Sequence, residues 1–260
     1  MTDPRTHVKE RYAAAAGTAR DPMIGRHGRC GESYYDGAEL DGLPAAVAGA
    51  SLGCANPLVV ADLRAGEIVL DLGSGAGLDV LLSARRVGPT GQAYGIDMTP
   101  EMLEQARANQ RAAGVTNAQF LKGFIEDVPL PTGSVDVVLS NCVINLSPSK
   151  SVVFSEMFRV LRPGGRIAVA DVVAEHPLDA ETKARLETES PCLAGAATRA
   201  DYEEGLTGAG FVDVALETQR EVAPGFSSVI ARGSSRASLR RHRGPEGPSG
   251  DSPGRTRPPA

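Results

Sequence analysis

The chain has 260 residues, which is enough for one buried core with additional segments or for two small domains. Its hydrophobic fraction of 42% and charged fraction of 23% are those of an ordinary globular protein, which excludes disorder throughout. The formal net charge of -5 gives no general attraction for nucleic acid, and no run of about 18 apolar residues could span a bilayer.

The N-terminus lacks the charged start, apolar middle and cleavage site of a secretion signal. We therefore expect a cytoplasmic location, where thiols stay reduced. The four cysteines are accordingly interpreted as thiols rather than as two structural disulfides: Cys30, Cys54, Cys142 and Cys192. Their separations exclude a local zinc knuckle but not a site assembled by the fold.

Helical and loop-like patterns are mixed in the first 65 residues, with helix-like stretches at 8–16 and 43–53 around a loop-like segment at 25–44. From residue 67 onward, short apolar runs alternate with helical patterns, which predicts a parallel sheet with helices on its faces. The expected strands are 67–74, 92–98, 118–125, 134–140 and 166–173, and the expected helices are 78–87, 100–114 and 150–161. We expect the N-terminal segment to lie over the carboxyl edge of this sheet.

Capping and breaking residues delimit several of these elements. Thr99 and Pro100 open one helix, and the "RPGG" sequence at 162–165 separates the last helix of this region from the fifth strand. Residues 177–197 are helical with interruptions, 198–211 form a helix that opens with a Thr198/Asp201 cap pair, and 212–222 and 226–233 form a closing antiparallel pair. The sequence predicts an α/β fold with a doubly wound, mostly parallel seven-stranded sheet.

Residues 233–260 form a tail rich in Gly, Pro, Ser and Arg. Six arginines against Glu246 and Asp251 put +4 on this tail and leave -9 on the rest of the chain. Because the tail is almost without apolar residues, we expect it to be disordered. A role in binding nucleic acid or an acidic partner is the alternative to a solvated tail.

The stretch "VLDLGSGAGLD" places Gly73, Gly75 and Gly77 after a strand and before a helix, where a backbone can approach a ligand closely. The GxGxG spacing departs from the GxGxxG of dinucleotide sites. Asp71 brings a carboxylate beside the loop, which suits an ammonium group better than a pyrophosphate. Asp97 ends the next strand, where a carboxylate can accept hydrogen bonds from ribose hydroxyls.

Glu126 and Asp127 follow the third strand, where they could accept a hydrogen bond from an adenine amino group or form a solvated loop. Together these positions describe a site for S-adenosylmethionine, and the assembly resembles the class I S-adenosylmethionine-dependent methyltransferases over about 65–232. The residues assigned to the cofactor site are Asp71, Gly73, Ser74, Gly75, Gly77, Asp97, Met98, Ile125, Glu126 and Asn141.

The stretch "LSNCVINLS" places Cys142 at the end of the fourth strand, at the edge of the sheet where ligands bind. Cys54 and Cys192 also fall outside the strands, in segments expected to cover that edge. Three converging thiols would form a soft sulfur site for a thiophilic ion. The alternative is that Cys142 is only a small buried hydrophobic residue.

With the shared nucleotide motifs, the stretches "SLGCANP", "SNCVINLSPSK" and "CLAGA" resemble the arsenite methyltransferases, from about residue 30 to 222. The resemblance implies that Cys54, Cys142 and Cys192 bind trivalent arsenic and that Cys30 takes part in redox steps. It also implies a thiol reductant, thioredoxin or glutathione. Members of that family often have neighbouring cysteines near the N-terminus, whereas "HGRCGESYY" has one, and Pro191 stands immediately before Cys192.

The resulting hypothesis is an arsenite methyltransferase that transfers methyl from S-adenosylmethionine to thiol-coordinated As(III), in arsenic detoxification. Trivalent arsenic carries a lone pair, so this transfer requires no general base, and we interpret the histidines as surface residues: His7, His27, His176 and His242. The alternatives are a methyltransferase for a small organic acceptor, such as a quinone or other ring carbon, and a non-catalytic thiol sensor of metalloids.

Four segments are expected from these patterns: 1–65 covering the active site, 66–175 binding S-adenosylmethionine, 176–232 with the arsenic-site helices and closing strands, and the 233–260 tail. We expect a monomer that acts on a small molecule, with thioredoxin as a candidate partner and with neither nucleic acid nor a membrane as a partner.

Overall fold

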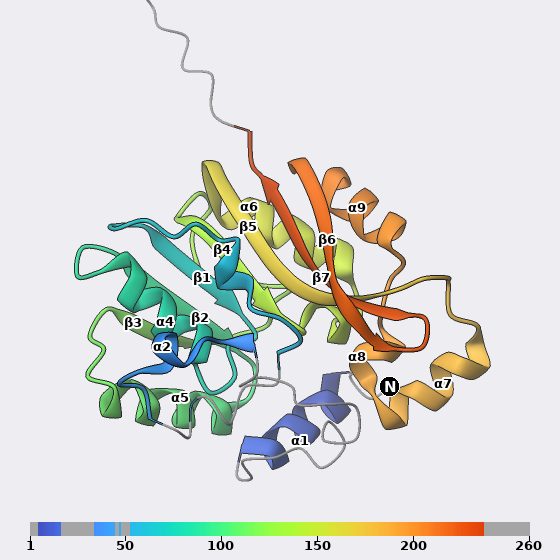
Figure 1. Cartoon of the computed structure of the whole chain (residues 1–260), viewed down its shortest axis with the longest axis horizontal. Coiled ribbons are helices and arrows are strands. Elements are labelled where there is room, and N and C mark those ends of the chain that lie inside the picture. Colours follow the sequence, from blue (N-terminus) through green and yellow to red (C-terminus); the bar gives the residue numbers. More distant parts are fainter. Residues whose placement is uncertain (1–4, 17–33, 45–46, 48–52, 237–260) are drawn as a thin grey trace, which may run out of the picture.

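The computed structural model describes residues 5–16, 34–44, 47 and 53–236. In this part of the chain seven strands form one sheet with the order β3-β2-β1-β4-β5-β7-β6 (Figure 1). The strands are β1 (Ile68–Leu72), β2 (Gln92–Asp97), β3 (Ala118–Lys122), β4 (Val135–Asn141), β5 (Leu161–Ala174), β6 (Val212–Ala223) and β7 (Phe226–Ser234). The helices are α1 (Arg5–Ala16), α2 (Gly37–Leu40), η3 (Pro57–Val59), α4 (Leu78–Val87), α5 (Pro100–Ala112), η4 (Ile144–Leu146), α6 (Lys150–Val160), α7 (Ala180–Glu189), α8 (Pro191–Ala194) and α9 (Arg199–Gly208).

The sheet is parallel from β3 across to β5, and β7 pairs antiparallel with both β5 and β6. The predicted doubly wound, mostly parallel sheet and its closing antiparallel pair are confirmed. The chain builds outward from β1 to β3 and then returns to place β4 on the other side of β1. Since ligands of such sheets bind where the strand order reverses, the carboxyl ends of β1 and β4 are where a site is expected.

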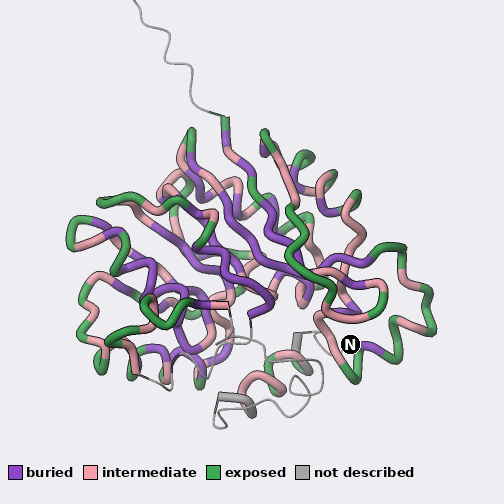
Figure 2. Tube along the Cα trace, in the orientation of Figure 1, coloured by how far each residue is buried: buried purple, intermediate pink, exposed green. Residues whose placement is uncertain are grey.

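Helices cover both faces of the sheet, because neighbouring residues of each buried strand point to opposite sides. Leu70 packs in a cluster with residues of α6 and α9, whereas the adjacent Val69 packs in a second cluster with residues of α4 and α5. Figure 2 shows the resulting buried central strands, with exposed segments mainly at the loops and on the outer sides of the helices.

Three local features differ from the sequence-based expectations. Strand β5 begins at Leu161, so the 162–165 breaker lies inside the strand, where it accompanies a shift of register between β4 and β5. Thr99 occupies the N-cap position of α5 without a side-chain cap bond, although the expected Thr198 cap of α9 is present. The 25–44 segment, expected to be loop-like, contains α2, because Asp36 and Glu39 form a capping box.

The N-terminal helix α1 lies beside the carboxyl edge of the sheet, near α7 and α8 (Figure 1). Arg11 of α1 donates a hydrogen bond of 3.4 Å to the backbone oxygen of Thr188 in α7. Most of the helix expected at 43–53, and the tail from residue 237, fall outside the described residues. None of the helices in the described ranges has the length and apolar character that crossing a bilayer requires.

Candidate active site

A pocket lies at the carboxyl ends of β1, β2 and β4, between the glycine loop and the loop after β3. All residues assigned to the cofactor site from sequence line this pocket except Gly77, which is the N-cap of α4. Val8 and Tyr12 of α1 complete part of its wall. The residues assigned from the sequence are therefore adjacent in space.

The glycine loop bends where side chains would not fit. Gly73 has φ 68°, and a Cβ there would lie 2.4 Å from a methyl carbon of Val143. Between Gly73 and Gly75, the hydroxyl of Ser74 is buried and has no hydrogen-bond partner among the described residues. A buried polar atom without a partner at this position suits a ligand that donates or accepts a hydrogen bond there.

Besides Glu126, three aspartates line the pocket: Asp71, Asp79 and Asp97. Burial raises the pKa of Asp71 well above its usual value, and the neighbouring Asp79 and Asp97 raise it further. Burial also raises the pKa of Asp97, although hydrogen bonds from the backbone amides of Thr99 and Gly75 oppose that shift. Because buried like charges repel, this group of acids favours a positively charged ligand.

S-adenosylmethionine carries both an ammonium and a sulfonium beside a nucleoside, so the residues of this pocket fit it. The carboxylate of Asp97 already orders the loop, since one oxygen accepts from Gly75 at 3.0 Å and the other from Thr99 at 2.8 Å. Of the two acids considered for adenine, Glu126 lines the pocket and accepts a hydrogen bond of 2.6 Å from Ser147, whereas Asp127 does not line it.

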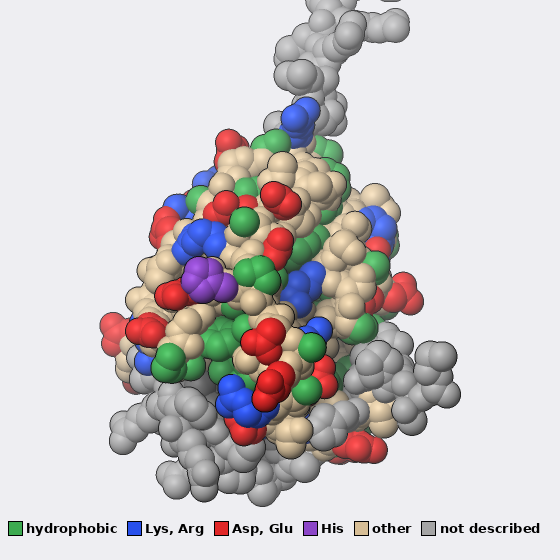
Figure 3. All heavy atoms as spheres, turned by 90° about the vertical axis from the view of Figure 1, so that its right-hand side faces the viewer, with side chains coloured by type: hydrophobic (Ala, Val, Ile, Leu, Met, Phe, Trp, Pro, Cys, Tyr) green, Lys and Arg blue, Asp and Glu red, His purple; other side chains and the backbone are tan. Residues whose placement is uncertain are grey.

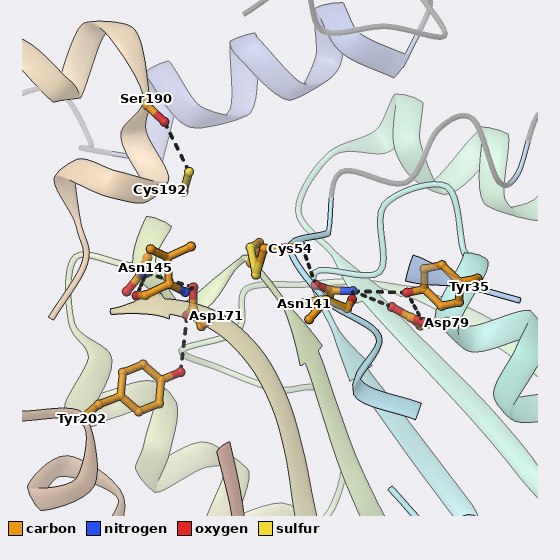
Figure 4. Close-up of a disulfide and its surroundings, with 12 residues drawn as sticks. Tyr35, Cys54, Asp79, Asn141, Asn145, Asp171, Ser190, Cys192 and Tyr202 are labelled. Atoms are coloured by element: carbon orange, nitrogen blue, oxygen red, sulfur yellow. Dashed lines mark hydrogen bonds between the residues drawn. A yellow bond between two sulfur atoms is a disulfide. The ribbon is translucent and has the colours of Figure 1, made fainter. Parts of the chain in front are cut away.

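The structure joins Cys54 and Cys142 in a disulfide with their Cα atoms 6.0 Å apart (Figure 4). The expectation that all four cysteines are thiols is therefore wrong for this pair. Spacing along the chain could not reveal the pairing, because 88 residues separate the two cysteines and the fold alone brings them together. Cys142 adopts a left-handed backbone with φ 58°, which is uncommon for a residue with a side chain.

Cys142 is half-buried and lines the pocket, so the alternative of a fully buried hydrophobic residue does not describe it. Cys192, on α8, is a free thiol. Cys54 belongs to an apolar cluster against which both Cys142 and Cys192 pack, although no three His, Cys, Asp or Glu side chains of the described residues are arranged as a metal site. Cys30 lies outside the described residues.

Two features stabilise helix α8, which carries Cys192. Pro191 occupies its first turn, which suits the fixed φ of proline. Lys150 donates a hydrogen bond of 2.5 Å from Nζ to the backbone oxygen of Gly195, directly after the helix. Burial raises the pKa of the Cys192 thiol, whose sulfur lies 3.5 Å from the hydroxyl oxygen of Ser190.

A buried polar group that was not predicted from the sequence lies beside this helix. Asp171, at the end of β5, is fully buried, accepts hydrogen bonds from Asn145 at 2.9 Å and Tyr202 at 3.3 Å, and has its pKa raised by burial to about 7. The signal in the sequence was an acidic residue, Asp171, within the otherwise aliphatic run "AVADVV". Asp79 and its partner Tyr35 were also missed, although Asp79 stands in the glycine motif itself.

Of the histidines, His176 is exposed, as expected for a surface residue. The expectations for the other three histidines concern side chains that fall outside the described part of the chain: His7, His27 and His242.

The fold and the pocket define a class I methyltransferase, and a family model described as a methyltransferase domain matches residues 63–219. The chain is 40% identical over 234 residues to an arsenite methyltransferase of Halobacterium salinarum, covering 84% of this chain and 60% of that protein. It is also 40% identical over 173 residues to one of Aquipseudomonas alcaligenes, covering 64% of this chain and 50% of that protein.

Among solved structures, an arsenic(III) S-adenosylmethionine methyltransferase from Chlamydomonas reinhardtii matches with a TM-score of 0.66 and 30% identity. The match covers 85% of this chain and 75% of that one. The chain belongs to the arsenite methyltransferase family. It spans between half and two thirds of the length of the two curated relatives described above.

Proposed function

We propose that the chain transfers a methyl group from S-adenosylmethionine to As(III) held by Cys54, Cys142 and Cys192. The observation that carries this proposal is that three cysteines from distant segments belong to, or pack against, one apolar cluster, with Cys142 also in the wall of the pocket. Thiolates are the protein ligands that soft ions prefer. The names and identities of the relatives support the same substrate.

The residues around the pocket bind and orient the methyl donor. Asp71 faces the ammonium end, Asp97 accepts hydrogen bonds from ribose hydroxyls, and Glu126 lies toward the base. Ser74, Met98 and Ile125 complete the cofactor site, with the glycines giving close backbone approach. When bound, S-adenosylmethionine would supply an electrophilic methyl group on a sulfonium: the arsenic lone pair forms the new C–As bond, the C–S bond breaks and S-adenosylhomocysteine leaves. Arsenic thereby loses two electrons formally, and oxidation of two thiols to a disulfide would return it to the trivalent state.

Arsenite binding exchanges oxygen for sulfur. Three thiols displace three hydroxyls from As(OH)₃, each S–H proton leaves with a hydroxyl as water, and arsenic stays trivalent during this exchange. The protein contributes mainly position, because it holds the arsenic beside the methyl donor. Burial of the Cys192 thiol keeps it protonated until a soft ion arrives.

The Cys54–Cys142 disulfide must be reduced before either sulfur can bind arsenic. The proposed reaction therefore includes a thiol reductant, thioredoxin or glutathione, and Cys30 as a further redox residue. Arsenic would arrive as a thiol complex. This requirement is supported by the observed bond, since a dithiol and a disulfide interconvert by thiol exchange.

The proposal includes a cytoplasmic monomer organised as a cover (1–65), a cofactor core (66–175), an arsenic-site region (176–232) and a tail (233–260). No role is assigned to nucleic acid. On the face shown in Figure 3, acidic and basic side chains of the described residues are interspersed, which supports that choice.

Arsenic speciation tests the function directly. The reduced protein is mixed with S-adenosylmethionine, arsenite and a thiol, and the arsenic species are separated after incubation. We expect methylated arsenic. Binding of arsenite and cofactor without methylation would favour a non-catalytic sensor, and failure to bind arsenite would favour a small organic acceptor.

A further inference from the structure

The carboxamide of Asn141 links the two cysteines of the disulfide. Asn141 directly precedes Cys142, and its Oδ1 accepts a hydrogen bond of 3.0 Å from the backbone amide of Cys54. Its Nδ2 donates to the backbone oxygen of Ala55 at 2.8 Å. The side chain of Asn141, at the end of β4, therefore holds the Cys54 segment through two hydrogen bonds. One comes from the backbone amide of Cys54 and the other goes to the backbone oxygen of Ala55.

The fit between this segment and Asn141 is close. A Cβ added to Gly53 would lie 2.3 Å from Nδ2 of Asn141, so only glycine lets the backbone approach the carboxamide this far. Cys54 itself is 5% exposed. The geometry around Cys54 is thus determined by contact with Asn141 as well as by the covalent bond between the sulfurs.

Asp79 and Tyr35 determine which way the carboxamide faces (Figure 4). The hydroxyl of Tyr35 donates to Oδ1 of Asp79 at 2.7 Å, and Nδ2 of Asn141 lies 3.3 Å from Oδ2 of Asp79 and 3.2 Å from the Tyr35 oxygen. A carboxylate only accepts hydrogen bonds, so it requires the NH₂ side of the amide to face it. The amide oxygen is then directed at Cys54.

We propose that Asn141 is a positioning residue for the Cys54–Cys142 pair and that Asp79, with Tyr35, holds its carboxamide in the required orientation. The proposal rests on the proposed function, in which these two sulfurs bind arsenic. It adds to the expected role of Asn141, because both polar atoms of its side chain already make hydrogen bonds within the protein. It also gives Asp79, on the helix that follows the glycine loop, a role in the thiol site.

The equilibrium between the disulfide and the dithiol tests this proposal without arsenic. In a dithiothreitol redox buffer, the protein disulfide gains two electrons and two protons while dithiothreitol is oxidised to its cyclic disulfide. Asn141→Ala removes the grip on the Cys54 segment, and we expect the equilibrium to move toward the dithiol by about tenfold. Alkylation and mass spectrometry of the Cys54 and Cys142 peptides give the ratio.

An isosteric exchange separates positioning from loss of packing and serves if Asn141→Ala does not fold. Asn141→Asp sets a second carboxylate against Asp79, and we expect the same shift toward the dithiol. In the double variant Asn141→Asp with Asp79→Asn, the amide is at position 79 and the carboxylate at position 141, so an amide again faces a carboxylate. We expect this second substitution to recover most of the lost disulfide stability. A merely structural disturbance would not be relieved by a second substitution in the same cluster.

Asn117→Asp is the matched control. Asn117 also donates to backbone oxygens, those of Ala84, Gly88 and Gly91. It precedes β3, however, whereas Cys142 follows β4. We expect this control to leave the equilibrium unchanged. An unchanged equilibrium in Asn141→Asp, or no recovery in the double variant, would overturn the proposal. Either result is independent of arsenic methylation, so a failure of the proposed function is recognised separately.

Discussion

Gly195 lies against Asn145 so closely that a Cβ on Gly195 would be 1.9 Å from the backbone oxygen of Asn145. This contact joins the end of α8, which carries Cys192, to η4, which follows Cys142. The glycine in "CLAGA" is therefore needed for the close approach of two segments that each hold a proposed arsenic ligand. Its replacement should displace Cys192 relative to the other two sulfurs.

Gly195→Ala is expected to lower methylation of arsenite by about tenfold or more, because the added carbon forces α8 away from η4. The affinity for S-adenosylmethionine should change much less, since no residue of α8 lines the pocket. Steady-state methylation and calorimetric titration measure the two effects. Gly208→Ala in α9 is the control, because a Cβ there meets no atom within 4 Å; full activity in Gly195→Ala would contradict the expectation.

Asp71→Asn should weaken S-adenosylmethionine binding by about tenfold, since the proposed function sets the buried carboxyl group of Asp71 against the ammonium end of the ligand. The same change relieves the repulsion among Asp71, Asp79 and Asp97, so the protein without ligand should unfold at a higher temperature. Asp127→Asn, which does not touch the pocket, is expected to change neither quantity. Unaltered affinity in Asp71→Asn would show that this carboxylate does not meet the ligand.

Asp171 should make the stability of the fold depend on pH. Burial raises its pKa from 3.8 to about 7, so between these values the folded protein binds more protons than the unfolded chain. The free energy of unfolding therefore falls as pH rises through this window. In urea titrations, Asp171→Asn should reduce the loss of stability between about pH 5 and about pH 8 by about 2–3 kcal/mol.

The comparison with Asp171→Asn isolates one carboxyl group, because Asp71, Asp79 and Asp97 remain in both proteins. Equal pH dependence of the two proteins would mean that Asp171 stays ionised in the fold. Tyr202→Phe removes the hydroxyl that lies 3.3 Å from Asp171 and should keep the dependence on pH.

Cys192→Ser should leave the Cys54–Cys142 disulfide intact, because Cys192 is not part of it. After reduction, arsenite should bind about tenfold or more weakly than to the unaltered protein, since one of three sulfur ligands is lost. Disulfide content is read from non-reducing peptide maps, and arsenite affinity from competition with a fluorescent dithiol reagent. Equal arsenite affinity would remove Cys192 from the proposed site.

The alternation of apolar runs and helical patterns predicted the sheet well, because each strand of a parallel sheet must be apolar on both faces. The glycine loop also identified most of the pocket, since Gly73 and Gly75 stand in a local pattern that directly encodes a backbone shape. These features depend on neighbours in sequence. The bounds of β5 were less predictable, because a Pro-Gly pair can end a strand or bend it within a shifted register.

Features of the thiol site depend on contacts between distant segments and were not predictable. Beside the disulfide, the backbone around Gly53 lies against Asn141, and neither local sequence predicts that contact. The same holds for Asp171, whose partners Asn145 and Tyr202 come from η4 and α9. The resemblance to a family predicts which cysteines bind arsenic, whereas the disulfide between two of them was found only in the structure.

X-ray absorption at the arsenic edge tests the central claim most directly, because it counts the atoms bound to arsenic. The measurement uses the reduced full chain loaded with one equivalent of arsenite and freed of other thiols. We expect three sulfur neighbours and no oxygen, with one sulfur fewer in Cys142→Ser. Arsenic surrounded by oxygen, or an unchanged sulfur count in Cys142→Ser, would contradict the proposed three-cysteine site.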